Sequence, residues 1–450
     1  MSWVVETLSG FEDRAAISSQ GCSYSYSELA TQIEKFNECL GKQVPSGSVV
    51  AILSDYSFLA IAVFFALQKN RNIIVPITTK VDYEVEERLQ EAFVDYALTI
   101  EEGDISVAPR TPASAEGHPI YQRLQTEEHA GLVLFSSGST GKPKAMVHNL
   151  DNLLETFRNK KSKKLNILVF LMFDHIGGLN TLLNTLSMGA TVVLPETRDP
   201  NEICGLIEKY RIHLLPASPT FLNLMLMSGG PGRFDLSSLK MISYGTEAMP
   251  TGLLTRLRET FPRVRFLQTF GTSETGITST SSKSSASTLL KIEDPNIEYK
   301  IVADELWLRS KTQILGYLNA SMERFTEDGW FKTGDLVDQE EDGYLRIIGR
   351  SQEVINVGGE KVLPIEVESV LLEMPQILDC TVYAEASSIT GQQVVANVVL
   401  QPGELPMAIK KMVRKFCRGK LDRYKIPVRI NVCQSVEATT RFKKSRKIQG

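Results

Sequence analysis

Apolar and polar residues follow two alternating patterns along the first 125 positions. Short apolar runs at residues 49–54 and 72–76 have the length and composition of buried strands, and residues 56–69 between them are typical of a buried helix. A further helix is predicted to begin at Ser25 or Ser27, because apolar residues follow these capping hydroxyls at helical spacing. The strand–helix–strand order predicts a parallel sheet covered by helices on both faces.

The same alternation continues beyond residue 130. Predicted strands lie at residues 130–135, 165–172, 190–195, 213–216 and 240–245, with helices at residues 149–158, 179–188, 203–210 and 219–227. Residues 297–348 contain short strands and turns, which predict a smaller β subdomain, and a distinct α/β unit follows Arg350. We interpret residues 101–120 and the serine-rich residues 279–288 as loops. The expected fold is α/β, with a large N-terminal domain of parallel-rich sheets and helices plus a β subdomain, and a small C-terminal α/β domain.

Composition narrows the class of protein. The 450 residues are 42% hydrophobic and 23% charged, which is typical of a folded chain of two or more domains. A net charge of −4 gives no support for a nucleic-acid-binding surface, and we expect no transmembrane segment because the longest apolar run is too short. The six cysteines are scattered without a CxxC pair, so we expect reduced thiols in a cytoplasm, without disulfides or a zinc site. The first residues lack the features of a signal peptide.

A turn rich in serine, glycine and threonine follows the predicted strand at residues 130–135. Its backbone N–H groups and hydroxyls can wrap around an anion, and Lys142 and Lys144 add positive charge. A Walker loop is excluded, because Ser136 replaces its first glycine and Pro143 follows Lys142. A flexible linker is the other alternative, which the flanking strand and the lysines disfavour. We therefore predict a polyphosphate-binding loop that contains Ser136, Ser137, Gly138, Ser139, Thr140, Gly141 and Lys144.

Other polar residues fall at the ends of predicted strands. Asp174 and His175 follow one strand, and residues 244–246 and 270–271 follow two others. Ligands of parallel sheets bind outside the carboxyl ends of the strands. We therefore expect these residues to share one crevice with the phosphate loop.

Five motifs, the phosphate loop first, occur in the order found in one superfamily. The others are QTFGTSETG at residues 268–276, DGWFKTGDL at 328–336 with YLRIIGR at 344–350, NVGGEKVLPIEVE at 356–368, and the basic stretch at 440–447. Together they resemble the adenylate-forming superfamily, which contains acyl- and aryl-CoA synthetases (AMP-dependent acid–thiol ligases), amino-acid adenylation domains and beetle luciferases. The Gly-Gly-Glu motif is similar to that of the CoA ligases, whereas amino-acid adenylation domains usually carry Gly-Phe-Arg there.

The resemblance implies an ATP site with Mg²⁺. Glu274 would be the metal ligand, Asp335 would accept hydrogen bonds from the ribose hydroxyls, and Arg350 would contact ribose and phosphate. The catalytic groups would be Thr140, Lys144, Glu274 and Lys444. Nucleotide contacts beyond the phosphate loop would come from Thr269, Phe270, Gly271, Thr272, Ser273 and Tyr344.

The resemblance also implies a mobile C-terminal domain. The domains would span residues 1–350 and 351–450, with a hinge at residues 351–353. Gly358 and Gly359 would line a channel for the pantetheine arm of CoA, or of a carrier protein. The family pattern Thr-x-x-Gly-Lys places its lysine at Lys444, with Lys443 in the glycine position, although Lys443 is an alternative.

The implied reaction joins a small-molecule carboxylic acid to a thiol. The carboxylate attacks the α-phosphorus of ATP, which gives an acyl-adenylate and pyrophosphate, and the thiol of CoA then displaces AMP. The acyl pocket would include Asp174, His175, Gly178, Tyr244, Gly245 and Thr246. Thr246 stands where relatives often have Gly or Ala, which favours a small or planar acid. Asp174 would bind a substrate amine in an amino-acid-activating enzyme, but would be an outer residue in a CoA ligase.

Two alternatives stay open at this point. An acyl carrier protein could accept the acyl group in place of CoA, since the same channel would serve. The chain could also be a nucleotide-binding relative without turnover, for which the unusual Lys443-Lys444 pair is the only support.

Overall fold

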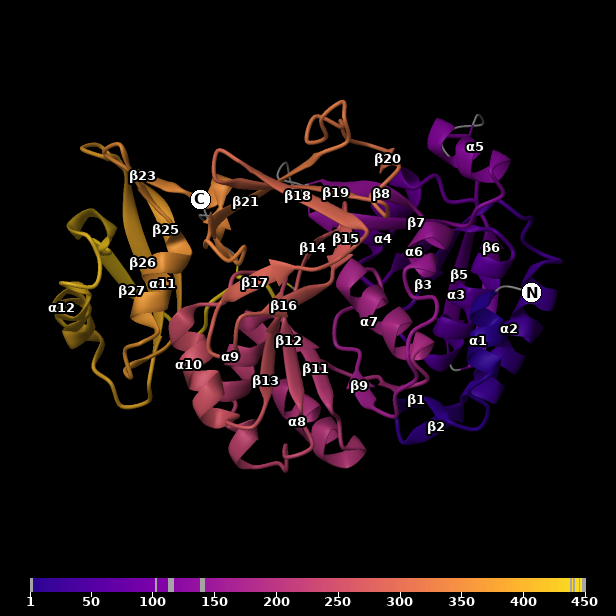
Figure 1. The fold of residues 1–450 in the computed structure, drawn as a ribbon, viewed down its shortest axis with the longest axis horizontal. Coiled ribbons are helices and arrows are strands. Elements are labelled where there is room, and N and C mark those ends of the chain that lie inside the picture. Colours follow the sequence, from indigo (N-terminus) through magenta and orange to yellow (C-terminus); the bar gives the residue numbers. More distant parts are fainter. Residues whose placement is uncertain are drawn as a thin grey trace.

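The chain folds into sheets and helices, in a computed structural model that describes residues 3–101, 103–111, 117–137, 142–437, 439, 442–444 and 446. The mixed α/β architecture confirms the predicted fold class. Figure 1 shows the larger N-terminal part in indigo to salmon, and the smaller C-terminal part in orange and yellow beside it. No helix among the described residues is long and apolar enough to cross a membrane.

One seven-stranded sheet contains the predicted strand–helix–strand unit. Val49 pairs with Ile73 in parallel register, and helix α3 (Phe58–Lys69) connects the two strands. Residues 60–67 of this helix are all buried, which explains why apolar residues occur on every side of it. The order is β20-β8-β7-β4-β3-β5-β6, with β3 Val49–Leu53, β4 Ile73–Ile77, β5 Tyr96–Glu101, β6 Asp104–Pro109, β7 Gly131–Ser137, β8 Pro143–Asn149 and β20 Gly316–Tyr317, and with helices α4 Asp82–Glu91, α5 Pro119–Thr126 and α6 Leu150–Glu155.

A second seven-stranded sheet lies at the bottom of Figure 1. Its flanking helix α2 (Tyr26–Leu40) begins as predicted, because Ser25 and Glu28 form a reciprocal capping box. The order is β13-β12-β11-β9-β10-β1-β2, with β1 Ala15–Ser19, β2 Cys22–Ser25, β9 Asn166–Leu168, β10 Thr191–Val193, β11 Leu214–Ala217, β12 Met241–Tyr244 and β13 Arg265–Gln268. The other helices of this region are α1 Trp3–Ser9, α7 Ile176–Ser187, α8 Pro200–Tyr210, α9 Pro219–Met227 and α10 Thr251–Thr260, with a 3₁₀ turn η1 at Gly230–Gly232.

The β subdomain and the C-terminal unit complete the fold. The subdomain is a six-stranded sheet of β16 Thr280–Ser282, β17 Leu289–Ile292, β22 Leu345–Arg350, β21 Phe331–Gln339, β19 Glu305–Ser310 and β18 Ile297–Val302, in that order, next to the hairpin of β14 Phe270–Thr272 and β15 Gly276–Thr278. The 3₁₀ turn η2 (Ser351–Glu353) leads to the C-terminal unit of β23 Ile355–Val357, β24 Glu360–Val362, α11 Pro364–Leu371, β25 Ile377–Ser387, β26 Gly391–Leu400, α12 Pro406–Cys417, η3 Arg423–Lys425 and β27 Arg429–Val432.

Two stretches that we interpreted as loops contain regular structure. Strand β6 pairs antiparallel with β5, because Ile105 and Val107 pack against the core of the first sheet. In the serine-rich stretch, Ser282 and Ser285 accept hydrogen bonds from the backbone of Gln268 and Phe266 on strand β13. Serine hydroxyls therefore satisfy this edge strand, which composition alone could not indicate.

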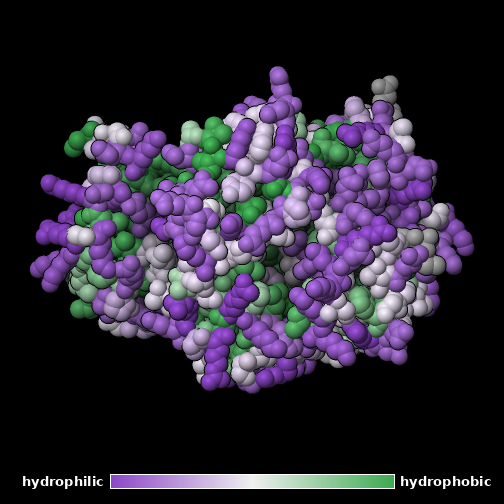
Figure 2. Space-filling model, viewed as in Figure 1, coloured by the Kyte–Doolittle hydropathy of each residue, from purple (hydrophilic) through white to green (hydrophobic). Residues whose placement is uncertain are grey.

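The two parts of the chain pack closely against each other. A single apolar cluster includes residues of α9 and α10 as well as α11 and β25. At Gly252 on α10, a Cβ atom would lie 2.9 Å from the backbone of Ser369 and Leu372, so only glycine lets α11 approach this closely. The face in Figure 2 is covered mainly by hydrophilic residues, with hydrophobic ones in small patches.

Candidate active site

The strands on both sides of the predicted phosphate loop form one antiparallel pair. Ser136 on β7 pairs with Lys144 on β8, and Ser137 pairs with Pro143. Gly138, Ser139, Thr140 and Gly141 lie outside the described residues, so their part in phosphate binding stays a prediction. The Lys144 ammonium lies 5.7 Å from the centre of the Tyr317 ring.

The predicted metal ligand meets the same tyrosine. Glu274 follows β14, and the hydroxyl of Tyr317 donates a hydrogen bond of 3.0 Å to its Oε1. The neighbouring turn is held by the hydroxyls of Thr272 and Thr275, which lie 2.9 Å apart. Lys144 and Glu274 are thus brought together as expected, through Tyr317, which the sequence motifs did not single out.

A buried histidine lies behind the metal-ligand motif. His148 on β8 is 1% exposed, and neither of its ring nitrogens has a hydrogen-bond partner among the described residues. Burial lowers its pKa to about 4, so His148 is neutral near pH 7. No sequence pattern pointed to this histidine.

The predicted ribose-binding pair is formed across two strands. Asp335 and Arg350 are directly opposite in β21 and β22, and Arg350 Nε lies 2.7 Å from Asp335 Oδ1. Asp335 is 4% exposed, and burial raises its pKa to about 6 although Arg350, Arg324 and Lys443 lower it. Among the described residues, Asp335 Oδ2 is buried without a hydrogen-bond partner. An orphaned carboxylate oxygen of this kind fits a ribose hydroxyl as donor.

Tyr344 is not part of this arrangement. It precedes β22, whereas Arg350 ends that strand, which puts about 20 Å of extended chain between them. The ring of Tyr344 lies between the ammonium groups of Lys283, at 5.4 Å, and Lys291, at 5.9 Å, beside the antiparallel pair of β16 and β17. Tyr344 and Arg350 therefore lie at opposite ends of β22, and a nucleotide contact by Tyr344 stays a prediction.

The two adjacent lysines near the C-terminus have different surroundings. Lys444 Nζ is bound to Asp379 Oδ1 at 2.9 Å and to the carbonyl of Cys380 at 2.6 Å, within the C-terminal unit. Lys443 instead lies close enough to Asp335 for its charge to lower that carboxyl's pKa. Lys444 Nζ is therefore held within the C-terminal unit in this structure, and its role in adenylation stays a prediction.

The backbone conformation favours the alternative register, in which Lys443 is the lysine of the family pattern. The family has glycine before its lysine, and the residue with a glycine-like φ of +51° here is Phe442, not Lys443. Thr439, three residues before Phe442, binds Lys443 through two hydrogen bonds, from Thr439 N to the Lys443 carbonyl and from Lys443 N to Thr439 Oγ1. Thr439 to Lys443 thus fits the pattern Thr-x-x-Gly-Lys with Phe442 in the glycine position.

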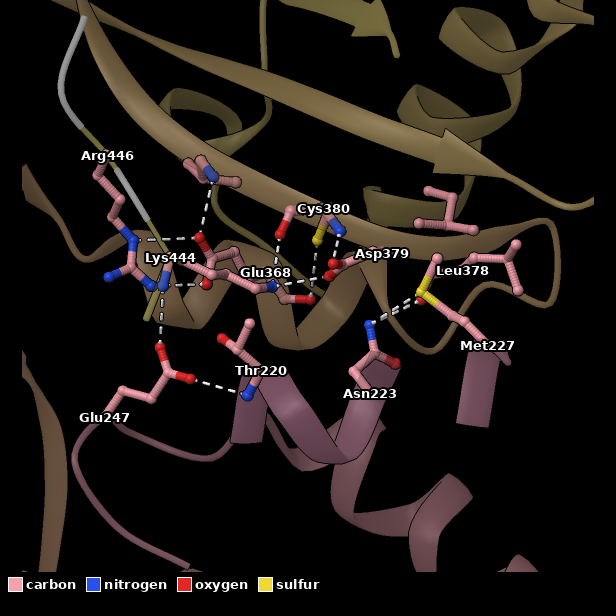
Figure 3. A network of polar contacts seen from close by, with 12 residues as sticks. Thr220, Asn223, Met227, Glu247, Glu368, Leu378, Asp379, Cys380, Lys444 and Arg446 are labelled. Atoms are coloured by element: carbon pink, nitrogen blue, oxygen red, sulfur yellow. Dashed lines mark hydrogen bonds and ion pairs between the residues drawn. The ribbon is translucent and has the colours of Figure 1, made fainter. Parts of the chain in front are cut away.

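Lys444 belongs to a buried ionic network, shown in Figure 3. Arg446 forms ion pairs with Glu368, at 2.9 Å, and with Glu353, at 3.0 Å. Burial opposes the charge on Lys444, but Asp379 and Glu368 outweigh it and raise its pKa. The backbone N–H of Lys444 also reaches Glu247 in the N-terminal part, at 3.3 Å. The network therefore joins the tail to both parts of the chain.

The predicted acyl side lies where β12 ends. Thr246 has φ +72°, a left-handed conformation that strains a β-branched residue, and its Oγ1 is buried without a partner among the described residues. At Gly245, a Cβ atom would lie 2.5 Å from Thr269 Oγ1, so this close approach requires glycine. At Gly271, a Cβ atom would likewise collide with the backbone of Gly276. Strain and close packing at one strand end are typical of functional sites.

Asp174 and His175 have local partners. Asp174 Oδ2 lies 3.6 Å from Arg88 Nη1, and the guanidinium of Arg88 also lies 6.0 Å from the Phe135 ring on the phosphate strand. His175 caps helix α7, since its Nδ1 accepts from Gly177 N at 3.0 Å. Gly178 is required for packing, because a Cβ there would meet the carbonyl of Met172 at 2.3 Å.

Two family models match this chain. The model of the AMP-binding enzyme covers residues 4–318, and that of the AMP-binding enzyme C-terminal domain covers residues 366–443. The chain belongs to the AMP-binding enzyme family.

Related proteins of this family are named as CoA ligases. An indoleacetate–CoA ligase of Aromatoleum aromaticum is 30% identical over 75% of this chain and 68% of its own length. A probable CoA ligase of Humulus lupulus is 32% identical over 62% of this chain, and the match spans 55% of that relative's length. An anthranilate CoA ligase solved with anthranoyl-AMP has the same fold, with a TM-score of 0.80 over 98% of this chain and 95% of that one, at 20% identity.

The AMP-binding enzyme has the groups that a nucleotide and Mg²⁺ require. Asp335 and Arg350 fit a ribose, and the carboxylate of Glu274 beside Lys144 fits a cation shared with phosphates. The described residues contain no cluster of three or more His, Cys, Asp or Glu that could hold a metal alone. A metal here would therefore depend on nucleotide oxygens as further ligands.

One predicted element lies apart from the others. Gly358 and Gly359 form the exposed turn of the β23–β24 hairpin, with φ values of +63° and +97°. Gly358 N binds the carbonyl of Thr390 and Gly359 N binds Asn356 Oδ1, both within the C-terminal unit. The structure does not bring this turn to the nucleotide residues of the AMP-binding enzyme.

Proposed function

We propose that this protein activates a carboxylic acid with ATP and transfers the acyl group to the thiol of CoA. The observation that best supports this proposal is the ion pair of buried Asp335 with Arg350, because the second carboxylate oxygen of Asp335 is left for a ribose hydroxyl, and the charge of Lys443 also acts on this carboxyl. Membership of the AMP-binding enzyme family and the CoA-ligase names of its relatives support the same reaction.

In the first step, the residues hold the substrates and stabilise charge on phosphate oxygens. Asp335 accepts from the ribose hydroxyls, and Lys443 lies between the acid's carboxylate and the α-phosphate. Lys144 and the loop before it stabilise the departing pyrophosphate electrostatically. Glu274 would hold Mg²⁺, which would neutralise phosphate charge when bound. The second step requires Lys443 to leave so that a thiol can reach the acyl carbon.

We propose that residues 351–450 make this movement as a unit relative to residues 1–350, with the hinge at η2. Glu353 in that turn is bound to Arg446, so release of the tail would also release the hinge. The movement would bring Gly358 and Gly359 to the site, where they would line the channel for the pantetheine arm. CoA is the preferred acceptor because the relatives are CoA ligases, and a carrier protein is the alternative.

The substrate we propose is a small or planar acid without an amine. Thr246 reduces the space at the strand end, and Arg88 already neutralises Asp174, which would otherwise attract an ammonium group. The six cysteines are all free thiols, which supports a reducing compartment such as a cytoplasm.

Pyrophosphate release with a panel of aromatic, aliphatic and amino acids tests the proposal. We expect release with small aromatic or planar acids, and thioester formation when CoA is added. Release with an acid but no thioester with CoA would favour a carrier protein as acceptor. Nucleotide binding without pyrophosphate release from any acid would contradict the proposal in favour of a non-catalytic relative.

A further inference from the structure

Residues 312–319 form a strap between the two halves of the phosphate site. On one side, Ile314 N donates to the carbonyl of Glu274 at 2.9 Å. On the other, Leu315 N donates to the carbonyl of Val147 at 2.7 Å, and Leu318 N to that of Ala145 at 2.9 Å. The strap therefore fixes the Glu274 motif relative to strand β8.

The strap also forms hydrogen bonds with the residues before and after Lys144 in the chain. The amide of Asn319 accepts from Ala145 N at 2.9 Å and donates to the carbonyl of Pro143 at 2.9 Å. These bonds fix the backbone on each side of the lysine, which leaves only the direction of its side chain to be set.

Tyr317 occupies the centre of the strap and contacts both charged groups. It is 6% exposed, its hydroxyl donates to Glu274 Oε1 at 3.0 Å, and its ring lies 5.7 Å from Lys144 Nζ. The hydroxyl uses one carboxylate oxygen, and Oε2 is then the oxygen available to a cation.

Lys144 and Glu274 carry opposite charges and both contact Tyr317, yet they form no ion pair with each other in the described structure. The hydroxyl of Tyr317 holds the carboxylate, and its ring face attracts the ammonium. We propose that Tyr317 is a positioning residue that keeps Glu274 and Lys144 apart, so that the carboxylate binds the metal while the lysine binds phosphate. This inference rests on the proposed function, and it adds the residue that positions the groups for metal and phosphate.

The test compares Tyr317→Phe, which removes only the hydroxyl, with Tyr317→Leu, which also removes the ring. Tyr24→Phe is the matched control, because Tyr24 stacks on Phe58 away from the site. Mn²⁺ binding is followed by electron paramagnetic resonance with a non-hydrolysable ATP analogue, and analogue binding is measured separately without metal.

We expect Tyr317→Phe to raise the Mn²⁺ dissociation constant about tenfold, as is typical when a partner of a metal ligand is lost, with metal-free analogue binding unchanged within about twofold. Tyr317→Leu should weaken both, since Lys144 loses the ring. Unchanged Mn²⁺ binding in Tyr317→Phe would overturn the inference, and so would an equal loss of metal-free binding in that variant. Glu274→Gln separates the two proposals: if it too binds Mn²⁺ normally, the assignment of the metal site itself fails.

Discussion

The protein places cations at its predicted nucleotide site in two different ways. Lys144 lies on β8, between backbone hydrogen bonds made by Asn319, inside one continuous sheet. Lys443 lies on a tail that is held by Phe442, which packs on Phe170 and Phe221 at ring distances of 5.3 Å, and by the Lys444 network. The first cation is built into a domain, whereas the second is supplied by docking between domains.

The docked interface contains buried polar atoms without hydrogen-bond partners among the described residues. On the side that faces the C-terminal unit, four buried atoms have no hydrogen-bond partner among the described residues. They are Nε and Nη2 of Arg256, Oδ1 of Asn223 and Oγ1 of Thr220. Asn223 and Arg256 do reach the carbonyl of Leu378, but with bonds of 3.2 Å. Each unsatisfied group costs about 1–3 kcal/mol, so rehydration on separation would offset lost contacts. An interface of this kind is suited to repeated opening, and a sheet is not.

The largest effect is expected from the docked cation itself. Lys443→Ala should slow adenylate formation about 100- to 1,000-fold, because a positioned charge at the reacting phosphate is lost, and should spare thioester formation from a supplied acyl-adenylate. Stopped-flow pyrophosphate release and a thiol assay measure the two steps. Lys444→Met should retain adenylation within about tenfold. If Lys444→Met is the inactive variant and Lys443→Ala is active, the register that we base on Phe442 is wrong.

Next in size is the loss of the buried pair that holds the tail. Asp379→Asn leaves Lys444 buried without its carboxylate, and should lower the free energy of unfolding by about 3 kcal/mol. Asp422→Asn removes an exposed carboxylate from Lys425, which keeps its ion pair with Glu366, and should cost less than about 1 kcal/mol. Urea denaturation followed by circular dichroism gives both values. Equal values would show that Lys444 is not a structural anchor.

A smaller effect is expected from pH at Asp335. Its pKa is raised from 3.8 to about 6, so below that pH the carboxyl is protonated and accepts ribose hydroxyls less well. The inhibition constant of adenosine, which has no phosphate to titrate, should rise about tenfold between pH 7.5 and roughly pH 5, since one pKa unit is worth about 1.4 kcal/mol. Asp335→Asn should bind weakly with a flat profile. A flat profile in the parent protein would remove Asp335 from the ribose site.

The same shift fixes the sign of the stability change without ligand. A raised pKa means that the folded state holds this proton more tightly, so the contribution of Asp335 to stability is complete below about pH 4. It is lost as pH rises through about 6.

The smallest effect concerns the acyl side. Thr246→Gly should shift preference towards longer or bulkier acids by about 1 kcal/mol, because side-chain volume is exchanged for pocket volume. Glycine also accepts the φ of +72°, so the variant should be no less stable. Competition between short and long acids measures the shift. If the profile does not change, while Asp174→Ala destroys activity only with amine-bearing acids, an amino-acid-activating enzyme is the better interpretation.

Many helices and strands of the fold could be predicted from local sequence patterns. The helix that begins at Ser25 and the parallel strands on either side of α3 followed from period, capping and turn residues, and the β subdomain followed from its short strands and turns. These features depend on residues close in sequence. The pairing of Asp335 with Arg350 was expected only through the resemblance, because fifteen residues separate them in the chain.

The sequence by itself determined the fold class, the order of the motifs and the family, since these are properties of composition and spacing. Only the tertiary structure decided where the two adjacent lysines lie, because Phe442 adopts a positive φ and packs on the N-terminal part, and Lys444 enters the buried ionic network, whereas the charge of Lys443 acts on Asp335. The same holds for Tyr317, whose partners Glu274 and Lys144 are distant in sequence and meet only across the strap. Contacts of that kind depend on the packing of whole sheets, which no short stretch of sequence contains.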